Sequence, residues 1–339
     1  MRFLITGTAG FIGFHLARRL AAAGHEVVGY DGITANYDPA LKRARLAELE
    51  KLASFTPIEA MLEDRGRLEA AVADFRPEVL IHLAAQAGVR YSVENPDAYV
   101  SANLVGTFNL LEAVRRYPVT HLMLASTSSV YGGNQKVPFS ETDRTDFPVS
   151  LYASTKKATE ALSHSHSHLF DIPTTAMRFF TVYGPWGRPD MALFRFVSAI
   201  SEGRPIGTHG HGRMRRDFTF IDDLVEAIVR LVPIVPQRDR PVLTGRVADS
   251  LSPVAPWRVV NIGSGHPVAL MEFIRTIEAA LDKKAVVSML PMQAGDVTQT
   301  FADPSLLEAL TGYLPGTPLA AGIESFVRWF ADYQARQQT

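Results

Sequence analysis

The first 23 residues limit the fold of this chain more than any other segment. Residues 2–6 form a short apolar run, and Gly7, Gly10 and Gly13 follow it at intervals of three. From residue 12 to residue 23 the apolar positions fall on one face of a helix. A strand that enters a helix through glycines leaves backbone N–H groups and the positive end of the helix dipole open to an anion. We therefore predict a dinucleotide-binding turn; a tight strand–helix turn without a ligand is the alternative.

The same alternation of strand and helix continues beyond this turn. Apolar runs of strand length lie at 26–31, 79–85, 121–127 and 174–180, and helical patterns lie at 98–115 and 152–169. Repeated strand–helix–strand units imply right-handed crossovers between parallel strands. The predicted fold class is therefore α/β, with a Rossmann-type doubly wound parallel sheet.

The second half of the chain is less regular and predicts a smaller, discontinuous C-terminal substrate domain. Helices are expected at 222–231, 268–282 and 318–336, and residues 257–263 resemble a strand that returns to the main sheet. Residues 233–256 hold five prolines and are predicted to form a flexible surface insertion. The predicted division assigns dinucleotide binding to 1–183 with about 219–232 and 257–263, and substrate binding to 184–218 and 264–339.

An acidic residue at the end of the second predicted strand indicates the kind of dinucleotide. Asp31 lies 18 residues after Gly13. A carboxylate at this position accepts hydrogen bonds from both hydroxyls of a ribose and repels a 2′-phosphate. The predicted cofactor is therefore NAD rather than NADP.

A tyrosine and a lysine one helical turn apart form the second chemical signal. Tyr152 and Lys156 share a face of the helix predicted at 152–169. A nearby ammonium group lowers the pKa of a phenol, and the phenolate then takes a proton from an alcohol. A hydroxyl-rich segment at 126–132, which contains Thr127, ends another predicted strand at the edge where ligands bind. An isolated pair of this kind is usually a surface pair, so this interpretation depends on the neighbouring signals.

Composition excludes several other classes of function. The chain has 339 residues, no cysteine and a net charge of −1. Disulfides, thiolate zinc sites and a cysteine nucleophile are therefore excluded, and neither nucleic acid nor a membrane is an expected partner. We find no signal peptide and no apolar run of membrane-spanning length, and expect a cytoplasmic protein. His164 and His168 share a helical face without a third ligand nearby, so we predict no metal site and assign these histidines to the surface or a dimer face.

Six motifs occur in a fixed order along the chain: the glycine turn, residues 82–88, residues 103–107, the hydroxyl-rich segment, the tyrosine–lysine pair and residues 178–185. Together they resemble the extended short-chain dehydrogenase/reductases of the NAD-dependent epimerase/dehydratase family, from residue 1 to about residue 335. The resemblance implies that Tyr152 is the catalytic acid/base. It further implies that Lys156 lowers the pKa of Tyr152 and binds the nicotinamide ribose, and that Thr127 assists.

The same resemblance assigns the cofactor-binding residues. It implies that NAD contacts Gly7, Gly10, Phe11, Ile12, Gly13, Asp31, Leu62, Leu83, Ala84, Ala85, Asn103, Tyr152 and Lys156. Two positions depart from the family pattern. Met61 and Leu62 stand where an aspartate–leucine pair usually contacts adenine, and Gly32 stands where asparagine is common. We expect apolar packing and a backbone contact at the adenine instead.

The resemblance also implies a nucleotide-sugar substrate. Arg216 matches an arginine that binds the nucleotide diphosphate. Dehydratases of the family carry two acidic residues where this chain has Ser128 and Ser129, and decarboxylases carry one. Serine is a poor proton donor or base, so these residues favour a 4-epimerase, which oxidises C4 of the sugar, rotates the 4-keto sugar and reduces its other face.

Four segments are closely similar to UDP-glucuronate 4-epimerases: residues 37–42, 86–92, 178–192 and 290–297. The expected substrates are therefore UDP-glucuronate and UDP-galacturonate. In this interpretation Arg188 holds the substrate carboxylate through two hydrogen bonds, and Thr181 bonds the same group. The predicted substrate-binding set is Arg90, Thr127, Thr181, Arg188, Arg216, Gln293 and Asp296. A surface arginine in a loop rich in glycine and proline is the alternative for Arg188.

Three other functions stay open at this point: a UDP-glucuronate decarboxylase, a 4-epimerase of a neutral UDP-hexose, and a catalytically idle NAD-binding regulator. The family usually dimerises through two helices. This predicts a homodimer in which residues 104–114 and 158–169 pair across a two-fold axis. Packing of these residues within the core is the alternative.

Overall fold

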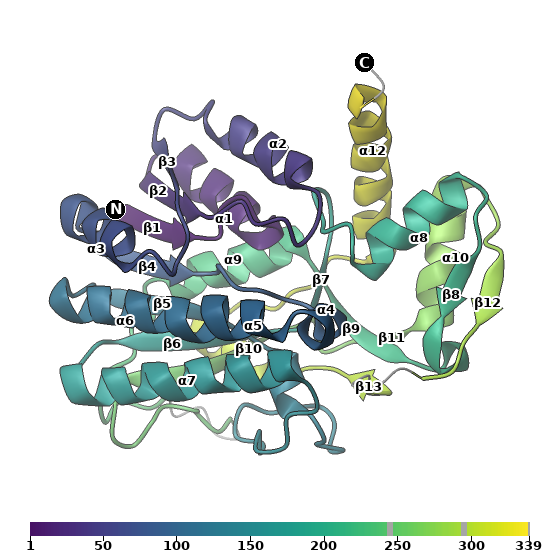
Figure 1. The fold of residues 1–339 in the computed structure, drawn as a ribbon. Helices are drawn as coiled ribbons and strands as arrows, with labels where there is room; N and C mark the ends of the chain where they lie inside the picture. The colour runs from purple at the N-terminus through teal and green to yellow at the C-terminus, as the bar shows by residue number, and fades with distance from the viewer. Residues whose placement is uncertain (243–246, 293–296, 338–339) are drawn as a thin grey trace.

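A seven-stranded parallel sheet lies at the centre of the computed structural model, which describes residues 1–242, 247–292 and 297–337 (Figure 1). The strand order is β10–β6–β5–β4–β1–β2–β3. These strands are β1 (Arg2–Thr6), β2 (Glu26–Asp31), β3 (Phe55–Glu59), β4 (Val79–His82), β5 (His121–Thr127), β6 (Thr174–Phe179) and β10 (Trp257–Ile262). The order confirms the predicted Rossmann-type doubly wound sheet, and β10 is the strand predicted to return to it.

The order of strands reverses beside β1. This strand pairs with β2 on one side and with β4 on the other, so the chain crosses over in opposite directions from this point. Because the strands are parallel, their carboxyl ends share one edge, and the loops after β1 and β4 diverge there. Ligands bind in such a crevice in doubly wound proteins.

Helices cover both faces of the sheet (Figure 1). One face packs against α3 (Arg65–Phe75), α6 (Thr107–Arg116) and α7 (Leu151–Phe170), and the other against α1 (Phe11–Ala22) and α9 (Ile221–Leu231). Leu4 and Ile5 of β1 are both buried, one in each layer, because successive side chains of a strand point to opposite faces. None of the helices in the described ranges has the length and apolar character needed to cross a bilayer.

The helix predicted at 98–115 is divided into three parts. It consists of α5 (Pro96–Tyr99), a π-helix η1 (Val100–Gly106) and α6. Asn103 in the π-helical part accepts a hydrogen bond from the backbone N–H of Gln86 and donates one to its carbonyl. Gly106 lies so close to Leu62 that a Cβ there would be 2.6 Å from the Leu62 Cβ. The wider turn therefore accommodates contacts with two loops that adjoin the crevice.

The remaining chain forms a smaller lobe beside the carboxyl edge of the sheet (Figure 1). In it β9 (Arg215–Phe220) pairs with β7 (Thr181–Tyr183), β11 (Pro267–Ala269) and β13 (Gln299–Thr300), and β8 (Ile206–Thr208) pairs with β12 (Val287–Met289). Its helices are α8 (Ala192–Ser201), α10 (Leu270–Leu281) and α12 (Leu319–Gln337). The apolar core beneath α1 and α9 continues into this lobe through Phe196, Phe273 and Phe326.

Shorter elements connect these layers. They are α2 (Pro39–Leu49), α4 (Val89–Glu94), α11 (Ser305–Thr311) and the 3₁₀-helices η2 (Ser128–Tyr131) and η3 (His209–Gly212). Asp38 caps α2 by accepting a hydrogen bond from the Ala40 N–H, and Pro39 occupies the first turn. This combination fixes the start of α2 close to the crevice.

The proline-rich insertion is anchored over part of its length, which differs from the predicted flexibility. His164 and His168 on α7 hydrogen-bond the Ser252 hydroxyl at 2.8 Å and the Val254 carbonyl at 2.6 Å. Residues 243–246 lie outside the described residues. The two histidines considered as metal ligands thus hold the insertion against the sheet domain.

Buried histidines connect the main sheet to its surroundings. His121 at the start of β5 donates to the Val232 carbonyl at 2.9 Å, and its other ring nitrogen lies 2.8 Å from the Thr175 hydroxyl. Burial lowers the pKa of His121 to about 4 and, with the charge of Lys156, lowers the pKa of His82 to about 3. Both rings are therefore neutral in the folded protein near neutral pH.

Replacing His121 by Asn should make folding stability less sensitive to acid. A histidine with a folded-state pKa below its unfolded value gains a proton on unfolding, so its stabilising contribution is full above about pH 6.5 and falls toward about pH 4. The slope changes by about 1.4 kcal/mol per pH unit for each proton. Urea unfolding across this pH range measures the slope, with the exposed His266→Asn as control. An unchanged slope in His121→Asn contradicts the assignment.

Candidate active site

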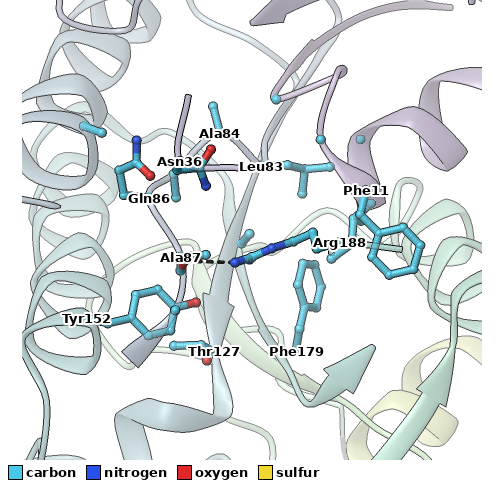
Figure 2. Close-up of a pocket in the computed structure, with 18 of the residues that line it drawn as sticks. Phe11, Asn36, Leu83, Ala84, Gln86, Ala87, Thr127, Tyr152, Phe179 and Arg188 are labelled. Carbon is cyan, nitrogen blue, oxygen red and sulfur yellow. Dashed lines mark hydrogen bonds between the residues drawn. The ribbon is translucent and has the colours of Figure 1, made fainter. Parts of the chain in front are cut away.

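A cavity of about 410 Å³ lies at the carboxyl edge of the large sheet (Figure 2). Segments from both the sheet domain and the smaller lobe line it. The predicted site residues among its lining are Gly7, Gly10, Phe11, Ile12, Gly13, Asp31, Leu62, Leu83, Ala84, Ala85, Thr127, Ser128, Ser129, Tyr152, Lys156, Thr181 and Arg188. Residues that are distant in the sequence thus meet at the position that the strand order predicts.

The glycine turn at one end of the cavity is closely packed. Gly7 has a φ of +81°, and a Cβ at this residue would lie 2.7 Å from the Ala84 nitrogen. A Cβ at Gly13 would lie 2.0 Å from the Gly7 carbonyl oxygen. Only glycine permits these approaches. Helix α1 begins at Phe11, so the N–H groups of its first turn are placed to bind a pyrophosphate.

Asp31 lies beside this turn at the end of β2. Its carboxylate accepts hydrogen bonds from the backbone N–H groups of Ala9 and Ile33, each at 2.9 Å. Each carboxylate oxygen keeps a further lone pair, and the side chain lines the cavity. This geometry suits the predicted binding of ribose hydroxyls.

Sequence reasoning missed Lys42, which lines the same end of the cavity. Its ammonium group donates to the Thr34 carbonyl at 2.6 Å and to the Asn36 amide oxygen at 2.8 Å. Burial lowers the pKa of Lys42 to about 8, and the Asp31 carboxylate opposes this effect. Lys42 ends the segment 37–42, which carried part of the family resemblance, but nothing in the local sequence signals that this lysine is buried.

The two departures from the family pattern near the adenine position are spatially linked. A Cβ at Gly32 would lie 2.4 Å from the Met61 sulfur. The Met61 side chain thus uses the space that any larger residue at position 32 needs. Both residues line the cavity with Leu62, so this region is apolar, as predicted.

Tyr152, Lys156 and Thr127 line the central part of the cavity (Figure 2 labels Tyr152 and Thr127). Burial raises the pKa of Tyr152, whereas hydrogen bonding with Thr127 and the charge of Arg188 lower it. The net direction is upward, so the predicted lowering is wrong for the protein without ligands. Loss of water around the phenol outweighs the combined effect of the Thr127 hydroxyl and the charge of Arg188.

Lys156 is buried, and this burial lowers its pKa to about 8. The Glu160 carboxylate, one helical turn further along α7, opposes the shift. The two side chains share a helix face. Near neutral pH, Glu160 therefore helps Lys156 to remain charged.

Glu160 belongs to a buried hydrogen-bonded network that the sequence analysis did not identify. Its Oε1 accepts from the Ser126 hydroxyl at 2.6 Å and from Arg178 Nε at 2.9 Å, and its Oε2 accepts from Arg178 Nη2 at 2.9 Å. Ser126 precedes Thr127 on β5, and Arg178 lies beside it on β6. One carboxylate thus fixes the helix of Tyr152 and Lys156 relative to the strand end that bears Thr127. The spacing of Glu160 four residues after Lys156 was the available signal.

Arg188 extends into the cavity from the loop after β7 (Figure 2). Its Nε and Nη2 donate to the two carboxylate oxygens of Asp190 at 3.0 and 2.6 Å, and Nη2 also donates to the Ala87 carbonyl at 3.0 Å. Nη1 carries the two remaining N–H groups. Arg188 and Tyr152 line the same cavity, and each affects the pKa of the other.

Three predicted site residues do not line this cavity. Arg90 is exposed on α4, and Asn103 is buried with its amide bonded to Gln86 and Thr155. Arg216 on β9 donates to the carbonyls of Val297 and Thr298 at 2.7 and 3.2 Å. Asn103 thus supports the loop after β4, and the proposed ligand contacts of Arg90 and Arg216 stay predictions. Gln293 and Asp296 lie outside the described residues.

The chemistry of the lining fits a dinucleotide. One continuous cavity joins the glycine turn, the Asp31 carboxylate, the apolar surface of Met61 and Leu62, and the Tyr152–Lys156 pair. The glycine turn fits a pyrophosphate and the Asp31 carboxylate fits a ribose. The apolar surface fits a base, and the Tyr152–Lys156 pair fits a nicotinamide ribose. Within the described ranges, no group of three or more His, Asp or Glu side chains is arranged to hold a metal ion.

Comparison with known proteins agrees with this geometry. Residues 3–239 match the family described as "NAD dependent epimerase/dehydratase family". The chain is 58% identical to the "Probable UDP-glucuronate 4-epimerase" of Rhizobium meliloti (strain 1021), covering 100% of this chain and 99% of the relative. It is 43% identical to "UDP-glucuronate 4-epimerase 4" of Arabidopsis thaliana, covering 97% of this chain and 75% of that protein.

A solved structure is similar over nearly the whole chain. It is the UDP-glucuronic acid 4-epimerase from Bacillus cereus in complex with UDP-glucuronic acid and NAD. The TM-score is 0.87 at 32% identity, with 98% of this chain and 100% of that chain covered.

The Glu160→Gln substitution should lower the pKa of Lys156 below about 8, because it removes the negative charge that opposes the effect of burial. NMR titration of isotope-labelled lysine side chains measures this pKa, and Lys156→Met identifies the signal. Glu112→Gln, on α6, is the matched control, since Glu112 pairs with Arg115 instead. A pKa of Lys156 that is unchanged or higher in Glu160→Gln contradicts the assignment.

Proposed function

This chain belongs to the NAD dependent epimerase/dehydratase family, and we propose that it interconverts UDP-glucuronate and UDP-galacturonate by inverting C4 of the sugar. The observation that carries the proposal is the position of Arg188 in the same cavity as Tyr152 and Thr127. The two remaining N–H groups on Nη1 of Arg188 can donate to a substrate carboxylate beside the pair with Asp190, and a phenol with a nearby hydroxyl exchanges a proton with an alcohol. Carboxylate binding and proton exchange in one cavity together select a uronate whose C4 hydroxyl reacts.

When bound, NAD accepts hydride from C4 and returns it after the sugar has turned. We infer that the glycine turn, Asp31 and Lys42 hold the cofactor, and that Lys156 bonds its nicotinamide ribose. Tyr152 takes the proton of the C4 hydroxyl and later returns a proton to the same oxygen. The Thr127 hydroxyl, which lowers the pKa of Tyr152 and lines the same cavity, orients the phenol toward that oxygen.

The serines beside Thr127 support epimerisation over elimination. Ser128 and Ser129 both line the cavity, and the Thr127 hydroxyl lies 3.2 Å from that of Ser129. Loss of water from the sugar requires an acid and a base near C5 and C6, and neutral hydroxyls are poorly suited to either task. The residues beside Thr127 therefore disfavour loss of water from the sugar.

Retention of the carboxylate is the second requirement for this reaction. A ketone at C4 is β to the C6 carboxylate, so cleavage of the C5–C6 bond with release of CO2 competes with epimerisation. Cleavage requires that bond to align with the carbonyl π system. Arg188 and Thr181, which both line the cavity, oppose this alignment if they hold the carboxylate during rotation of the ring.

We propose that the two lobes divide the binding of the ligands. Residues 1–183 with about 219–232 and 257–263 hold NAD, and residues 184–218 with 264–339 hold most of the UDP-sugar. The strand pairing refines the boundary between the two lobes. The chain leaves the large sheet after Phe179, at the end of β6, and β7 then pairs with β9 in the smaller sheet. Arg188 and Thr181 then bind the sugar from segments next to the boundary.

Incubation with UDP-glucuronate and no added reductant should produce UDP-galacturonate. The reaction is redox-neutral, so the ratio of the two uronates should reach the same value from either substrate. Tyr152→Phe is the matched control and should lose nearly all activity while it retains NAD, since only the acid/base hydroxyl is removed. A UDP-pentose with CO2 as main product would indicate a decarboxylase, and turnover of neutral UDP-hexoses alone would indicate a different epimerase. NAD binding without any turnover would indicate an idle regulator.

We further propose a homodimer formed by the helices around α6 and α7. Five apolar side chains on η1, α6 and α7 are exposed: Val100, Val105, Phe108, Leu169 and Phe170. A cluster of this kind is typical of a surface that a second copy covers.

Light scattering should therefore give the mass of two chains for the wild-type protein and of one chain for Phe108→Glu, because a charge at the centre of a two-fold contact is repeated across it. The control is Phe147→Glu, which changes an exposed phenylalanine outside these helices. A monomeric wild-type protein would contradict the proposed homodimer.

A further inference from the structure

Arg45 is a buried arginine that the proposed reaction does not use. It lies on α2, is fully buried, and among the described residues its guanidinium group donates only to neutral oxygens. Burial lowers its pKa, and the charge of Arg188 acts in the same direction. A buried cation without a carboxylate lowers stability relative to an apolar side chain of similar size. Its presence at this position therefore points to a role beyond packing.

The guanidinium group of Arg45 joins the glycine turn to the loop that precedes Arg188. Nη1 donates to the Ala9 carbonyl at 2.9 Å. On the other side, Nε and Nη2 donate to the Trp186 carbonyl at 3.2 and 2.6 Å, and Nη2 also reaches the Gly187 carbonyl at 3.3 Å. The planar fork thus fixes two consecutive peptide groups directly before Arg188.

The backbone that Arg45 holds is strained. Trp186 has a φ of +61°, in the left-handed region that a bulky side chain rarely adopts. Its ring packs against Phe14 and Trp329, with centroid distances of 5.1 and 5.4 Å. His15 on α1 also hydrogen-bonds the Pro185 carbonyl at 2.9 Å. Side chains from α1 and α2 therefore impose the shape of a loop more than a hundred residues away.

We propose that Arg45 is a positioning residue for Arg188, and that it sets the preference of the site for a uronate over a neutral sugar. The inference rests on the proposed function, in which Arg188 binds the substrate carboxylate. Arg188 directly follows the peptide groups that Arg45 holds, and its side chain returns across the cavity to the Ala87 carbonyl (Figure 2). A shift of this loop would move the guanidinium group away from the carboxylate while the contacts to the rest of the nucleotide sugar persist.

A double-mutant cycle in the Tyr152→Phe background tests this coupling without turnover. Titration calorimetry of the NAD-loaded protein gives the affinities for UDP-glucuronate and UDP-glucose. Arg45→Lys keeps the charge but loses the fork, and should weaken UDP-glucuronate binding by about tenfold and UDP-glucose binding by less than about twofold. Arg188→Ala should abolish the preference, and Arg45→Lys added to it should change the ratio of affinities by less than about twofold.

The matched control is Arg258→Lys, because Arg258 is also buried but pairs with Asp249 in the proline-rich insertion. It should leave the ratio of affinities unchanged. If Arg45→Lys does not fold, Arg45→Met removes the buried charge and keeps the apolar stem, with the same expected result.

Three outcomes overturn the inference. They are unchanged affinities for both ligands in the Arg45 variant, an equal loss of affinity for both ligands, and a loss that persists in full after Arg188→Ala. Each leaves the proposed function intact as long as the Tyr152→Phe parent prefers UDP-glucuronate. A parent without that preference would overturn the proposed function as well.

Discussion

The close approach between the glycine turn and the loop after β4 is the constraint on which the site depends. Gly7 and Gly13 leave no room for a Cβ, and the contacts that exclude it are backbone atoms of Ala84 and of Gly7 itself. This approach brings the first turn of α1 to the point where the strand order reverses. The pyrophosphate position, the Asp31 carboxylate and the loop that leads to Gln86 are then fixed together. A side chain at Gly7 would separate the two loops, and one at Gly13 would push the start of α1 away from the Gly7 carbonyl.

Two buried arginines extend this constraint in different ways. Arg178 forms an ion pair with Glu160, and their hydrogen bonds satisfy both charges where α7 meets β5 and β6. Arg45 forms no such pair among the described residues and bonds backbone carbonyls instead. The first network holds the proton-transfer groups with respect to one another. The second holds the loop before Arg188 with respect to the glycine turn, at a cost in desolvation that a carboxylate partner would reduce.

The parts that sequence predicted correctly are those with a local signature. Strand and helix periodicity, the glycine spacing and the four-residue separation of Tyr152 from Lys156 depend only on neighbouring residues. The π-helical turn was not predictable because it arises from contacts of Asn103 with Gln86 and of Gly106 with Leu62. Lys42 and Arg45 were missed because charged residues on a polar helix are normally exposed. The backbone contacts of Arg45 are with loops distant in the sequence, whereas Lys42 bonds the segment just before its own helix. The predicted direction of the Tyr152 pKa was wrong because burial is also a tertiary property.

In the proposed mechanism, recognition of the carboxylate and control of the proton are physically connected. Arg188 is the cation that lowers the pKa of Tyr152 against the effect of burial. A substrate carboxylate bound at Arg188 neutralises part of that charge and weakens its influence on the phenol. In the proposed mechanism the charge of Lys156 then favours the phenolate, although burial lowers the pKa of Lys156 itself to about 8. Glu160, one helical turn after Lys156, opposes the lowering of the Lys156 pKa. The network that positions Lys156 therefore also helps to keep it protonated. The proposed mechanism thus uses two cations, Arg188 for the substrate carboxylate and Lys156 for the phenol.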